Sequence, residues 1–422
     1  MNSIVNSLKK RGLIHSTTGE KVASILQKPT KIYLGIDPTA DSLHLGHWAG
    51  IMFLSWFARE GHEPYVLIGG GTAKIGDPSG KSKERPLLDS DLITKYAESI
   101  SRQCSRYLGK KAYYVNNNNW LGEYPLIDFL RDVGKEFRMG NMLSKESVKK
   151  RIQSDEGMSF TEFTYQAMQA YDFYYLRAEH GVMIQVGGSD QWGNITAGTD
   201  LIRKRGIGEA GGITFPLLLK GDGSKFGKSE GGTLWLDRQK TSPYQLYQYL
   251  VSVEDQEVGK LLRWLTFLPL EEIEAIEGEI ASGEFTPHDA QKKLAGEVLT
   301  LVHGREGREL AMKITEILSP GGGQVILNEQ LLETLADEIP GGIYERSEVI
   351  GLGLTQFLKN TGIVTSKQEG LRLVKNGGIS LNNRKVTDPH MSLTNKELYK
   401  GRHLLVGKGK KEKWLIQIKE KN

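Results

Sequence analysis

The sequence predicts an α/β protein with an open parallel sheet and a helical insertion, then an all-helical region and a small α+β unit. The sheet is predicted by short apolar runs that end in glycine or polar residues, some of them leading into helical periodicity. The second half of the chain lacks this succession of strand-like runs and helical segments. Helical patterns fill 242–317, and strand-like runs return only after residue 377.

The first half contains the predicted strands in order. "KIYLGID" at 31–37 predicts a strand, and "HWAGIMFLSWFAREG" at 47–61 predicts the helix after it. "PYVLIGGGT" at 64–72 predicts a buried strand before a glycine turn, and "GVMIQVGGSDQWGN" repeats that order with a strand at 182–186. Residues 115–180 are predicted to form a helical insertion. In open parallel sheets ligands bind beyond the carboxyl ends of the strands, so polar residues at these positions are site candidates.

The second half predicts three further segments. Ser242 and Pro243 suit the start of a helical domain at 242–320. The motifs "LSPGGGQ" and "IPGGIYE" predict a linker at 321–349. Residues 350–422 predict helices near 353–360 and 366–376, then a strand-rich end with a hairpin in "GGISLNNRKV". The predicted domains are therefore 1–220, a glycine-rich loop at 221–241, 242–320 and 350–422.

Composition bounds the class of protein. The chain has 422 residues, 38% hydrophobic and 25% charged, which is ordinary for a globular protein with a large core. Its one cysteine, Cys104, excludes a disulfide framework and a zinc site built on several thiolates. The N-terminus lacks the apolar stretch of a signal peptide, and no run approaches the roughly 20 apolar residues of a membrane span. We therefore expect a cytoplasmic protein without membrane contact.

Positive charge is concentrated at the C-terminal end. Residues 351–422 hold 15 Lys and Arg against 5 Asp and Glu, a balance of +10, although the whole chain carries only +4. A basic tail on a slightly acidic body predicts binding to a polyanion, while a single charge run is more often a solvated surface. The candidate nucleic-acid contacts are Lys408, Lys410, Lys411 and Lys413.

Two histidines in "DPTADSLHLGHWAG", His44 and His47, lie where the first predicted helix begins. A metal site would need further ligands, and no HExxH or similar spacing is present. The alternative is an anion bound at the helix N-terminus, where free backbone N–H groups favour negative charge and Gly46 allows close approach. Alone, such a pair is more often structural or incidental.

Two other segments are open to a functional or a structural interpretation. "GDGSKFGKSEGGTLWL" at 221–236 could bring Lys225 and Lys228 to phosphates, although it lacks GxxxxGK[ST] and could be a solvated loop. Tyr165, Gln169 and Asp172 are spaced i, i+4, i+7 and share one helix face. Spacing alone favours a solvated face for these three residues.

An ordered set of motifs carries a family resemblance over nearly the whole chain. "HLGH" is similar to the HIGH signature and "KFGKS" to the KMSKS signature of the class I aminoacyl-tRNA synthetases. "YLGIDPTADSLHLGH", "IGDPSGKSKER", "SFTEFTYQAMQAYDF" and "GGSDQWGNITAG" resemble blocks of the bacterial tyrosyl-tRNA synthetases, in the expected order. The resemblance implies a Rossmann-type doubly wound parallel sheet. It also implies a C-terminal RNA-binding domain with the fold of a ribosomal small-subunit protein.

The resemblance implies a tyrosine–tRNA ligase, which forms tyrosyl-adenylate from L-tyrosine and ATP, releases pyrophosphate and transfers tyrosine to the 3′ end of its tRNA. It places tyrosine on Tyr33, Asp77, Tyr165, Gln169, Asp172 and Gln191. It places ATP on Gly35, Asp37, His44, His47, Gly188, Asp190 and Lys228. The residues implied in catalysis are His44, His47, Thr39, Lys225, Lys228, Lys81 and Arg85, of which Lys81 and Arg85 could equally be solvated loop charges.

The chemistry needs positioning and cationic stabilisation, because a carboxylate that is already ionised attacks the α-phosphorus of ATP. The resemblance implies Mg²⁺ with ATP, no tightly bound cofactor, no protein-held metal and a homodimer formed through the insertion. Leu34 and Gly50 depart from the family pattern near the ribose, where they offer no hydrogen-bonding side chain. Two alternatives stay open: the tryptophanyl sister enzyme, and a non-catalytic RNA-binding protein on the same scaffold.

Overall fold

The computed structural model describes residues 4–79, 87–153, 157–221, 223–229, 232–283, 286, 288–319, 329–409 and 412–419. The side chains of residues 146, 147, 150, 229, 329 and 330 are not described. The chain forms two compact units, Met1–Thr241 with Ser252–Val302 and Ser242–Val251 with His303–Asn422. No described helix is both long and apolar enough to cross a membrane.

The first unit is built on a six-stranded sheet in the order β1-β6-β5-β2-β3-β4. Its strands are β1 (Ser16–Thr17), β2 (Lys31–Ile36), β3 (Glu63–Ile68), β4 (Tyr113–Asn116), β5 (Ile184–Gly188) and β6 (Gly211–Phe215). All neighbours pair in parallel except β1 with β6. The strands predicted at 31–37, 64–72 and 182–186 are confirmed as β2, β3 and β5, whereas β1, β4 and β6 were not predicted.

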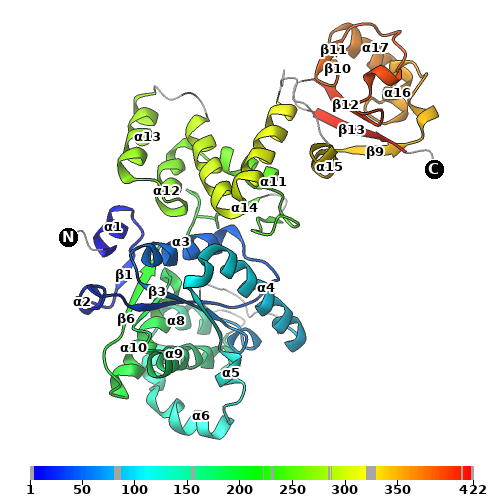
Figure 1. The fold of residues 1–422 in the computed structure, drawn as a ribbon. Coiled ribbons are helices and arrows are strands. Elements are labelled where there is room, and N and C mark those ends of the chain that lie inside the picture. Colours follow the sequence, from blue (N-terminus) through cyan, green and yellow to red (C-terminus); the bar gives the residue numbers. More distant parts are fainter. Residues whose placement is uncertain are drawn as a thin grey trace. The chain divides into compact units, whose positions relative to one another are not determined.

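Helices cover both faces of this sheet, as a doubly wound fold requires. The helices α3 (Leu45–Arg59) and α4 (Ser90–Leu108) lie on one face, and α9 (Phe160–His180) and α10 (Trp192–Lys204) lie on the other (Figure 1). The chain leaves β2 through α3 and leaves β5 through α10, so the strand order reverses between β2 and β5. A crevice is expected at the carboxyl ends of these two strands.

The predicted insertion is helical, and its helices are α5 (Asn118–Leu121), α6 (Leu126–Asp132), α7 (Met139–Leu143), α8 (Glu146–Ile152) and α9. Ser159 caps the start of α9 by accepting from the Glu162 N–H, and Gly181 ends the helix in the left-handed conformation. A buried ion pair of 2.6 Å joins Arg151 of α8 to Glu162 of α9. The insertion therefore fixes the helix that carries Tyr165, Gln169 and Asp172.

The short helix α1 (Ile4–Lys10) precedes the sheet, and α2 (Lys21–Ile25) lies between β1 and β2 in the chain. The predicted helical region follows the last strand of the sheet. That region contains α11 (Pro243–Val251), α12 (Asp255–Leu265), α13 (Leu270–Ser282) and α14 (Asp289–Leu318). Gly304 interrupts α14 with φ 76° and ψ 177°, a conformation open essentially to glycine alone. The helix kinks there, and the second compact unit takes up α14 from His303 onwards.

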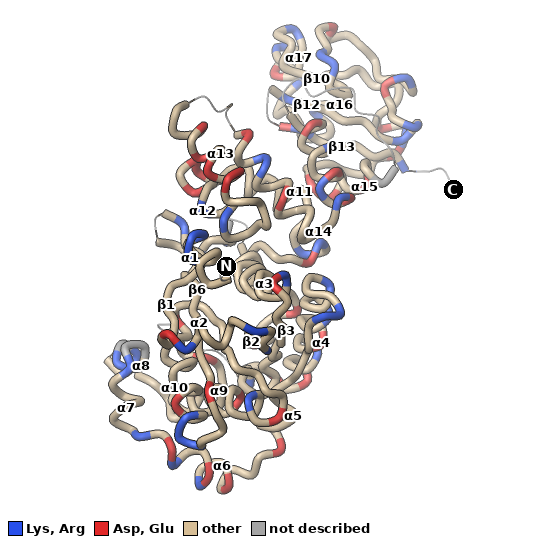
Figure 2. The backbone as a smooth tube through the Cα atoms, turned by 60° about the vertical axis from the view of Figure 1, so that its left-hand side comes forward, with Lys and Arg blue, Asp and Glu red and all other residues tan. Residues whose placement is uncertain are grey.

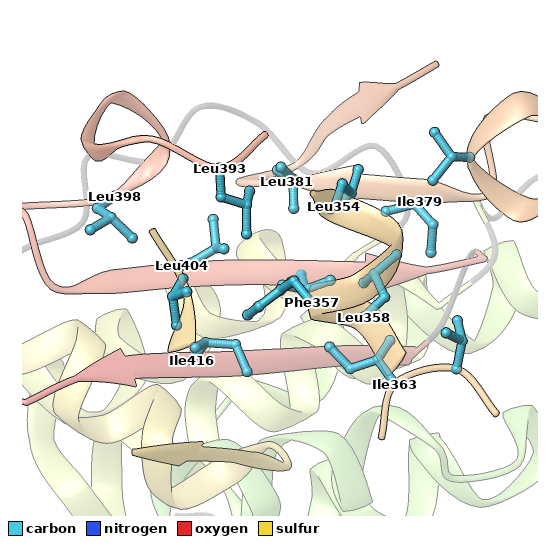
Figure 3. Packing of buried hydrophobic residues seen from close by; sticks show 14 of the residues in the cluster. Leu354, Phe357, Leu358, Ile363, Ile379, Leu381, Leu393, Leu398, Leu404 and Ile416 are labelled. Atoms are coloured by element: carbon cyan, nitrogen blue, oxygen red, sulfur yellow. The ribbon is translucent and has the colours of Figure 1, made fainter. Parts of the chain in front are cut away.

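The second unit contains a five-stranded sheet in the order β11-β10-β12-β13-β9. Its strands are β9 (Gly341–Tyr344), β10 (Ile379–Leu381), β11 (Arg384–Val386), β12 (His403–Lys408) and β13 (Glu412–Ile418), and its later helices are α15 (Glu329–Glu338), α16 (Leu354–Asn360) and α17 (Lys367–Lys375). The hairpin in "GGISLNNRKV" is confirmed, because Asn382 and Asn383 turn the chain with positive φ angles of 49° and 63°. Phe357 and Leu358 of α16 pack against Leu404 and Ile416 of the sheet (Figure 3).

The linker predicted at 321–349 is wrong in its second half, which forms α15 and the strand β9. β9 pairs in parallel with β13. A Cβ added to Gly341 would lie 1.9 Å from the Leu415 carbonyl oxygen, so the glycine permits this close approach. The glycines of "IPGGIYE" therefore serve strand pairing and do not mark a flexible connection.

Candidate active site

A cavity of about 380 Å³ lies at the carboxyl ends of β2 and β5. The structure brings thirteen predicted site residues to its wall: Tyr33, Gly35, Asp37, Thr39, His44, His47, Asp77, Tyr165, Gln169, Asp172, Gly188, Asp190 and Gln191. These residues come from β2, the start of α3, the loop after β3, α9 and the turn after β5. The strand ends indicated this edge of the sheet, and the family resemblance supplied the individual residues.

The floor of the cavity is one face of the sheet. Tyr33 and Gln185 are paired neighbours on β2 and β5, and residues paired in this way project to the same face. The Tyr33 side chain is fully buried, its ring lies 5.3 Å from that of Phe173, and Gln185 is 2% exposed. Within the described residues, the Tyr33 hydroxyl and Gln185 Oε1 are buried without a hydrogen-bond partner. Two unsatisfied polar atoms at one end of a cavity indicate a ligand with a polar group there.

Asp172 lies at the same deep end and is 1% exposed. Asn117 Nδ2 donates to Asp172 Oδ2 at 2.9 Å, and the indole Nε1 of Trp120 donates to Oδ1 at 2.7 Å. Burial raises the pKa of Asp172 to about 8 although these two hydrogen bonds oppose the shift. Burial, and secondarily the carboxyl of Asp172, also raises the pKa of Tyr33 well above its usual value.

A second carboxyl, Asp37, is held by two hydroxyl groups. Thr72 Oγ1 donates to Asp37 Oδ1 at 2.7 Å, and the Tyr165 hydroxyl donates to Oδ2 at 2.8 Å. Thr72 Oγ1 also accepts from Asn117 Nδ2 at 2.9 Å. Asn117 and Thr72 thus connect the deep carboxyl, Asp172, to the carboxyl at the end of β2.

Amide side chains surround the third carboxyl, Asp77. Gln191 Nε2 donates to Asp77 Oδ2 at 2.7 Å. Asn194 Nδ2 lies 2.9 Å from Gln169 Oε1 and 3.3 Å from Gln191 Oε1. The neighbouring carboxyl of Asp190 has a raised pKa, mainly because of burial and then because of Asp77. The pocket therefore concentrates carboxyl groups, which suits a cationic ammonium group.

His44 and His47 cap their own helix. His47 N donates to His44 Nδ1 at 3.3 Å and His44 N donates to His47 Nδ1 at 3.2 Å, a reciprocal capping box. The two rings stack with centroids 3.7 Å apart. Within the described residues no group of three His, Cys, Asp or Glu side chains could hold a metal ion. Both histidines line the cavity at the N-terminus of α3. A helix N-terminus suits an anion.

The glycine-rich loop is attached to this histidine segment. Trp235 forms a bridge with His44, and Leu45 N donates to the Leu234 carbonyl at 2.9 Å. Gly227 has φ 83°, and a Cβ there would lie 3.0 Å from Leu45 Cβ. Lys225 and Lys228 are exposed and are not among the residues that line the cavity. Lys81 and Arg85 lie outside the described residues.

The two departures from the family pattern contact each other. A Cβ added to Gly50 would lie 3.3 Å from Leu34 Cδ2 and 3.3 Å from the ring of Phe215. Leu34 thus fills space that a larger residue at position 50 would need. Both residues line the cavity.

The four predicted nucleic-acid contacts have different outcomes. Lys413 is only 9% exposed, and its ammonium group donates to the carbonyl of Ile317 and, at 2.5 Å, to Asn383 Oδ1. This burial contradicts the prediction that Lys413 meets RNA, because its charge is used to cap the end of α14. Lys408 forms an ion pair of 3.1 Å with Glu369. Lys410 and Lys411 lie outside the described residues.

Five polar or aromatic residues of the site were missed by the sequence reasoning: Thr72, Asn117, Trp120, Gln185 and Asn194. Asn117 and Trp120 follow β4, so "YYVNNNNW" has the same strand-then-polar order as the recognised strands. The signal was available, but this strand was assigned to the insertion. Gln185 and Asn194 lie within recognised motifs, and only the side-chain contacts distinguish them from their neighbours.

Comparison with known proteins follows the same division of the chain. Residues 26–318 match the family of class I tRNA synthetases (W and Y), and 332–416 match the C-terminal domain of SYY-like tyrosine–tRNA ligases. A tyrosine–tRNA ligase of Protochlamydia amoebophila is 47% identical over 425 residues, covering 100% of both chains. A chloroplastic/mitochondrial tyrosine–tRNA ligase of Arabidopsis thaliana is 46% identical, covering 99% of this chain and 84% of its own.

A solved structure is also similar. A C-terminally truncated mitochondrial tyrosyl-tRNA synthetase from Aspergillus nidulans superposes with a TM-score of 0.65 and 33% identity. The superposition covers 74% of this chain and 92% of that one.

Proposed function

Because the chain belongs to the class I tRNA synthetases for tryptophan and tyrosine, and within them is a tyrosine–tRNA ligase, we propose that the cavity at β2 and β5 forms tyrosyl-adenylate from L-tyrosine and ATP. The tyrosine carboxylate attacks the α-phosphorus of ATP. The bond from that phosphorus to the bridging oxygen breaks, and pyrophosphate leaves. The 3′-terminal hydroxyl of the tRNA then attacks the carbonyl carbon of the adenylate, and AMP leaves.

The phenol of tyrosine binds at the deep end of the cavity. The Tyr33 hydroxyl has no partner in the described part of the chain, so a substrate hydroxyl satisfies it. The same substrate hydroxyl adds a donor to the buried Asp172, which already accepts from Asn117 and Trp120. A site built to pair a substrate hydroxyl rejects an analogue that lacks it, and the tyrosine enzymes are themselves the standard example, at roughly 10⁵ against phenylalanine. The unbonded Tyr33 hydroxyl beside the buried Asp172 is the observation that carries the assignment of tyrosine over tryptophan.

The amino group of tyrosine is assigned to the region of Asp77, Tyr165 and Gln169, and its carboxylate end to Gln191. The carboxyl groups of Asp37, Asp77 and Asp190 line this part of the cavity and attract an ammonium group. Gly35, Asp37, Gly188 and Asp190 are assigned to the nucleoside. Glycine at 188 supports this role, because a Cβ there would lie 2.6 Å from Asp190 Oδ1.

The triphosphate is assigned to Thr39, His44 and His47 at the start of α3, with Lys225, Lys228, Lys81 and Arg85 as further cations. The attachment of the glycine-rich loop to Leu45 supports a loop that closes over the histidines. We propose that Mg²⁺ arrives with ATP and is held mainly by phosphate oxygens and water, because the described residues offer no metal cluster of their own.

The tRNA is assigned to the C-terminal unit, which we keep as the RNA-binding domain. Figure 2 shows Lys and Arg positions along this unit. Its exposed cations include Lys367, Arg372 and Lys375 of α17. Exposed cations of this kind contact phosphates and make binding salt-dependent. They replace Lys413, which is buried. The working boundaries are a catalytic domain to about 220, the loop at 221–241, a helical domain, and the C-terminal domain.

We propose that the protein is a cytoplasmic homodimer formed through the insertion. Apolar side chains are exposed on α6 and α7, where Leu126 and Ile127 are 70% and 71% exposed and Met139 is 58% exposed. A surface of this kind indicates a protein partner. Ile127→Lys should shift the dimer towards monomer in sedimentation velocity, whereas Lys135→Glu on the same segment should not. A monomeric parent protein would contradict the assignment.

The test of the function is ATP–pyrophosphate exchange with tyrosine, phenylalanine and tryptophan as separate substrates. We expect exchange with tyrosine alone. Asp172→Asn should reduce tyrosine-dependent exchange by more than 100-fold, and Asp200→Asn, which changes an exposed carboxylate on α10, should leave it unchanged. Exchange driven by tryptophan, or full activity of Asp172→Asn, would overturn the pocket assignment.

A further inference from the structure

Asn194 has a buried side-chain amide and is not one of the predicted site residues. It is 6% exposed and lies in the first turn of α10. Its Nδ2 group has three acceptors around it: Gln169 Oε1 at 2.9 Å, Gln191 Oε1 at 3.3 Å and Ser79 Oγ at 3.3 Å. One side-chain amide therefore contacts α9, the turn after β5 and the loop after β3 at once.

The direction of these hydrogen bonds follows from one charge. The Asp77 carboxylate can only accept, so Gln191 must turn its Nε2 towards Asp77, where the contact is 2.7 Å. Gln191 then presents Oε1 to Asn194, so Asn194 must donate to it from its Nδ2 group. That same group faces Gln169, which must therefore also present Oε1.

We propose that Asn194 is a positioning residue that fixes the amide orientation of Gln169 and Gln191 for tyrosine binding. The proposal rests on the assignment of these two glutamines to the amino and carboxylate ends of tyrosine. An amide can rotate by half a turn at small steric cost and then exchanges a donor for an acceptor. Asn194 prevents that exchange. Gln169 Oε1 has a second lone pair left for the substrate ammonium group, and Gln191 keeps its Nε2 group for a carboxylate.

The effect should appear in tyrosine recognition and not in the handling of ATP. Asn194→Ala should raise the KM for tyrosine about 10-fold in pyrophosphate exchange, with kcat and the KM for ATP changed less than about 3-fold. Asn194→Asp keeps the shape but replaces the donor by an acceptor facing two carbonyl oxygens. It should raise the KM for tyrosine further than Asn194→Ala.

A double-mutant cycle separates positioning from a structural role. If Asn194 acts through Gln169 and Gln191, then Asn194→Ala should have less than about a 2-fold effect on the KM for tyrosine when Gln169 and Gln191 are already alanine. A residue that merely supports the fold would give the same factor in both backgrounds. Thr196→Ala is the matched control on the same turn of α10, since its hydroxyl bonds to the carbonyls of Trp192 and Gly193 within that helix.

The outcomes are distinguishable. If Gln169→Ala and Gln191→Ala leave tyrosine binding unchanged, the pocket assignment fails. If those variants impair binding but Asn194→Ala does not, or if its effect is fully additive, the positioning role fails. An Asn194→Asp variant with the KM of the parent enzyme would also overturn the role, because it would mean that the direction of the hydrogen bonds has no consequence.

Discussion

At the scale of single residues, the deep end of the cavity holds a carboxyl group in surroundings that favour its neutral form. Asp172 is fully enclosed, and burial raises its pKa to about 8. In the unfolded chain the pKa of the same group lies near 3.8. Between these values the folded protein holds one proton more at this position than the unfolded chain. The contribution of Asp172 to stability therefore falls as pH rises from about 4 to about 8 and is constant above that.

Asp172→Asn should remove this dependence. The amide that replaces the carboxyl cannot ionise, so the free energy of unfolding of the variant should exceed that of the parent protein by an amount that grows with pH, at most about 1.4 kcal/mol per pH unit. Urea denaturation at pH 5, 6.5 and 8 measures the difference. A difference that does not change with pH would mean that the carboxylate is already ionised in the folded protein. The same variant should have lost tyrosine activation, so the residue opposes stability and serves function.

Sequence reasoning located residues better than it located contacts. His44 was predicted because it lies where a helix begins, and Asp37 and Gly188 were implied by the family motifs that contain them, so all of this information is local in sequence. Asn117 meets Asp172 only because β4 and α9 converge, and 55 residues separate the two. The proximity of Leu34 to Gly50 likewise depends on how closely β2 and α3 pack. Such contacts depend on packing distances between elements, which periodicity does not contain.

At the scale of elements, the end of α14 shows how a lysine in a basic segment can be buried and need not face solvent. Lys413 of β13 donates to the carbonyl of Ile317 and, at 3.4 Å, to that of Ser319, and carbonyls at a helix end lack partners within their own helix. A run of lysines looks the same in sequence whether its members are solvated or buried. The alternation of β13, which places Lys413 and Leu415 on one face, was the available but weak signal.

Lys413→Met should destabilise the C-terminal unit by roughly 1–3 kcal/mol, because it leaves buried carbonyl groups unsatisfied. Lys419→Met is the control. It removes an exposed ion pair with Glu345 and should cost less than about 1 kcal/mol. Urea unfolding of both variants checks the difference. If Lys413→Met left stability unchanged but flattened the salt dependence of tRNA binding by about 0.7 to 0.9 in log–log slope, the original interpretation as a phosphate contact would be right.

The kink in α14 supplies another element-scale prediction. Gly304→Ala should destabilise the protein by roughly 1–3 kcal/mol, because alanine is strained at φ 76° and ψ 177°. Gly278 lies inside α13, and a Cβ there would meet nothing within 4 Å among the described residues. Gly278→Ala should therefore stabilise by about 0.5–1 kcal/mol. Equal effects of the two substitutions on the melting temperature would show that Gly304 has no special backbone requirement.

At the scale of the whole molecule, the C-terminal unit begins earlier than the sequence indicated. Leu331, Leu332 and Leu335 of α15 share a hydrophobic cluster with Leu405 and Leu415 of the C-terminal sheet. Glycine and proline residues indicate turns, but they do not reveal whether the chain on either side of a turn joins a sheet. The order of strands and helices was predictable, and the assignment of α15 and β9 to the second unit was not.

This assignment changes where the chain can be shortened. A protein ending at residue 318 should keep tyrosine-dependent pyrophosphate exchange within about 3-fold and lose tRNA charging, since the proposed activation residues all precede residue 230. A protein ending at residue 350 should show the same two activities but aggregate or unfold at a lower temperature. The reason is that α15 and β9 would then lack the strands β12 and β13 against which they pack. Exchange, charging and thermal unfolding of both proteins test this. Charging that survives either truncation would remove the C-terminal unit from tRNA recognition.

The polar groups of the cavity are largely bonded to one another. Gln191 is bonded to Asp77, Tyr165 to Asp37, and the two histidines to each other's backbone. At the amino and carboxylate ends, an incoming substrate therefore meets the one acceptor site of Gln169 Oε1 and the one N–H of Gln191 Nε2 that these bonds leave over. Among the described residues of the cavity, buried polar atoms are unpaired only at Tyr33 and Gln185. The amino-acid end of the ligand is thus recognised by groups that are already partly bonded, whereas the phenol meets polar atoms to which no described residue is bonded.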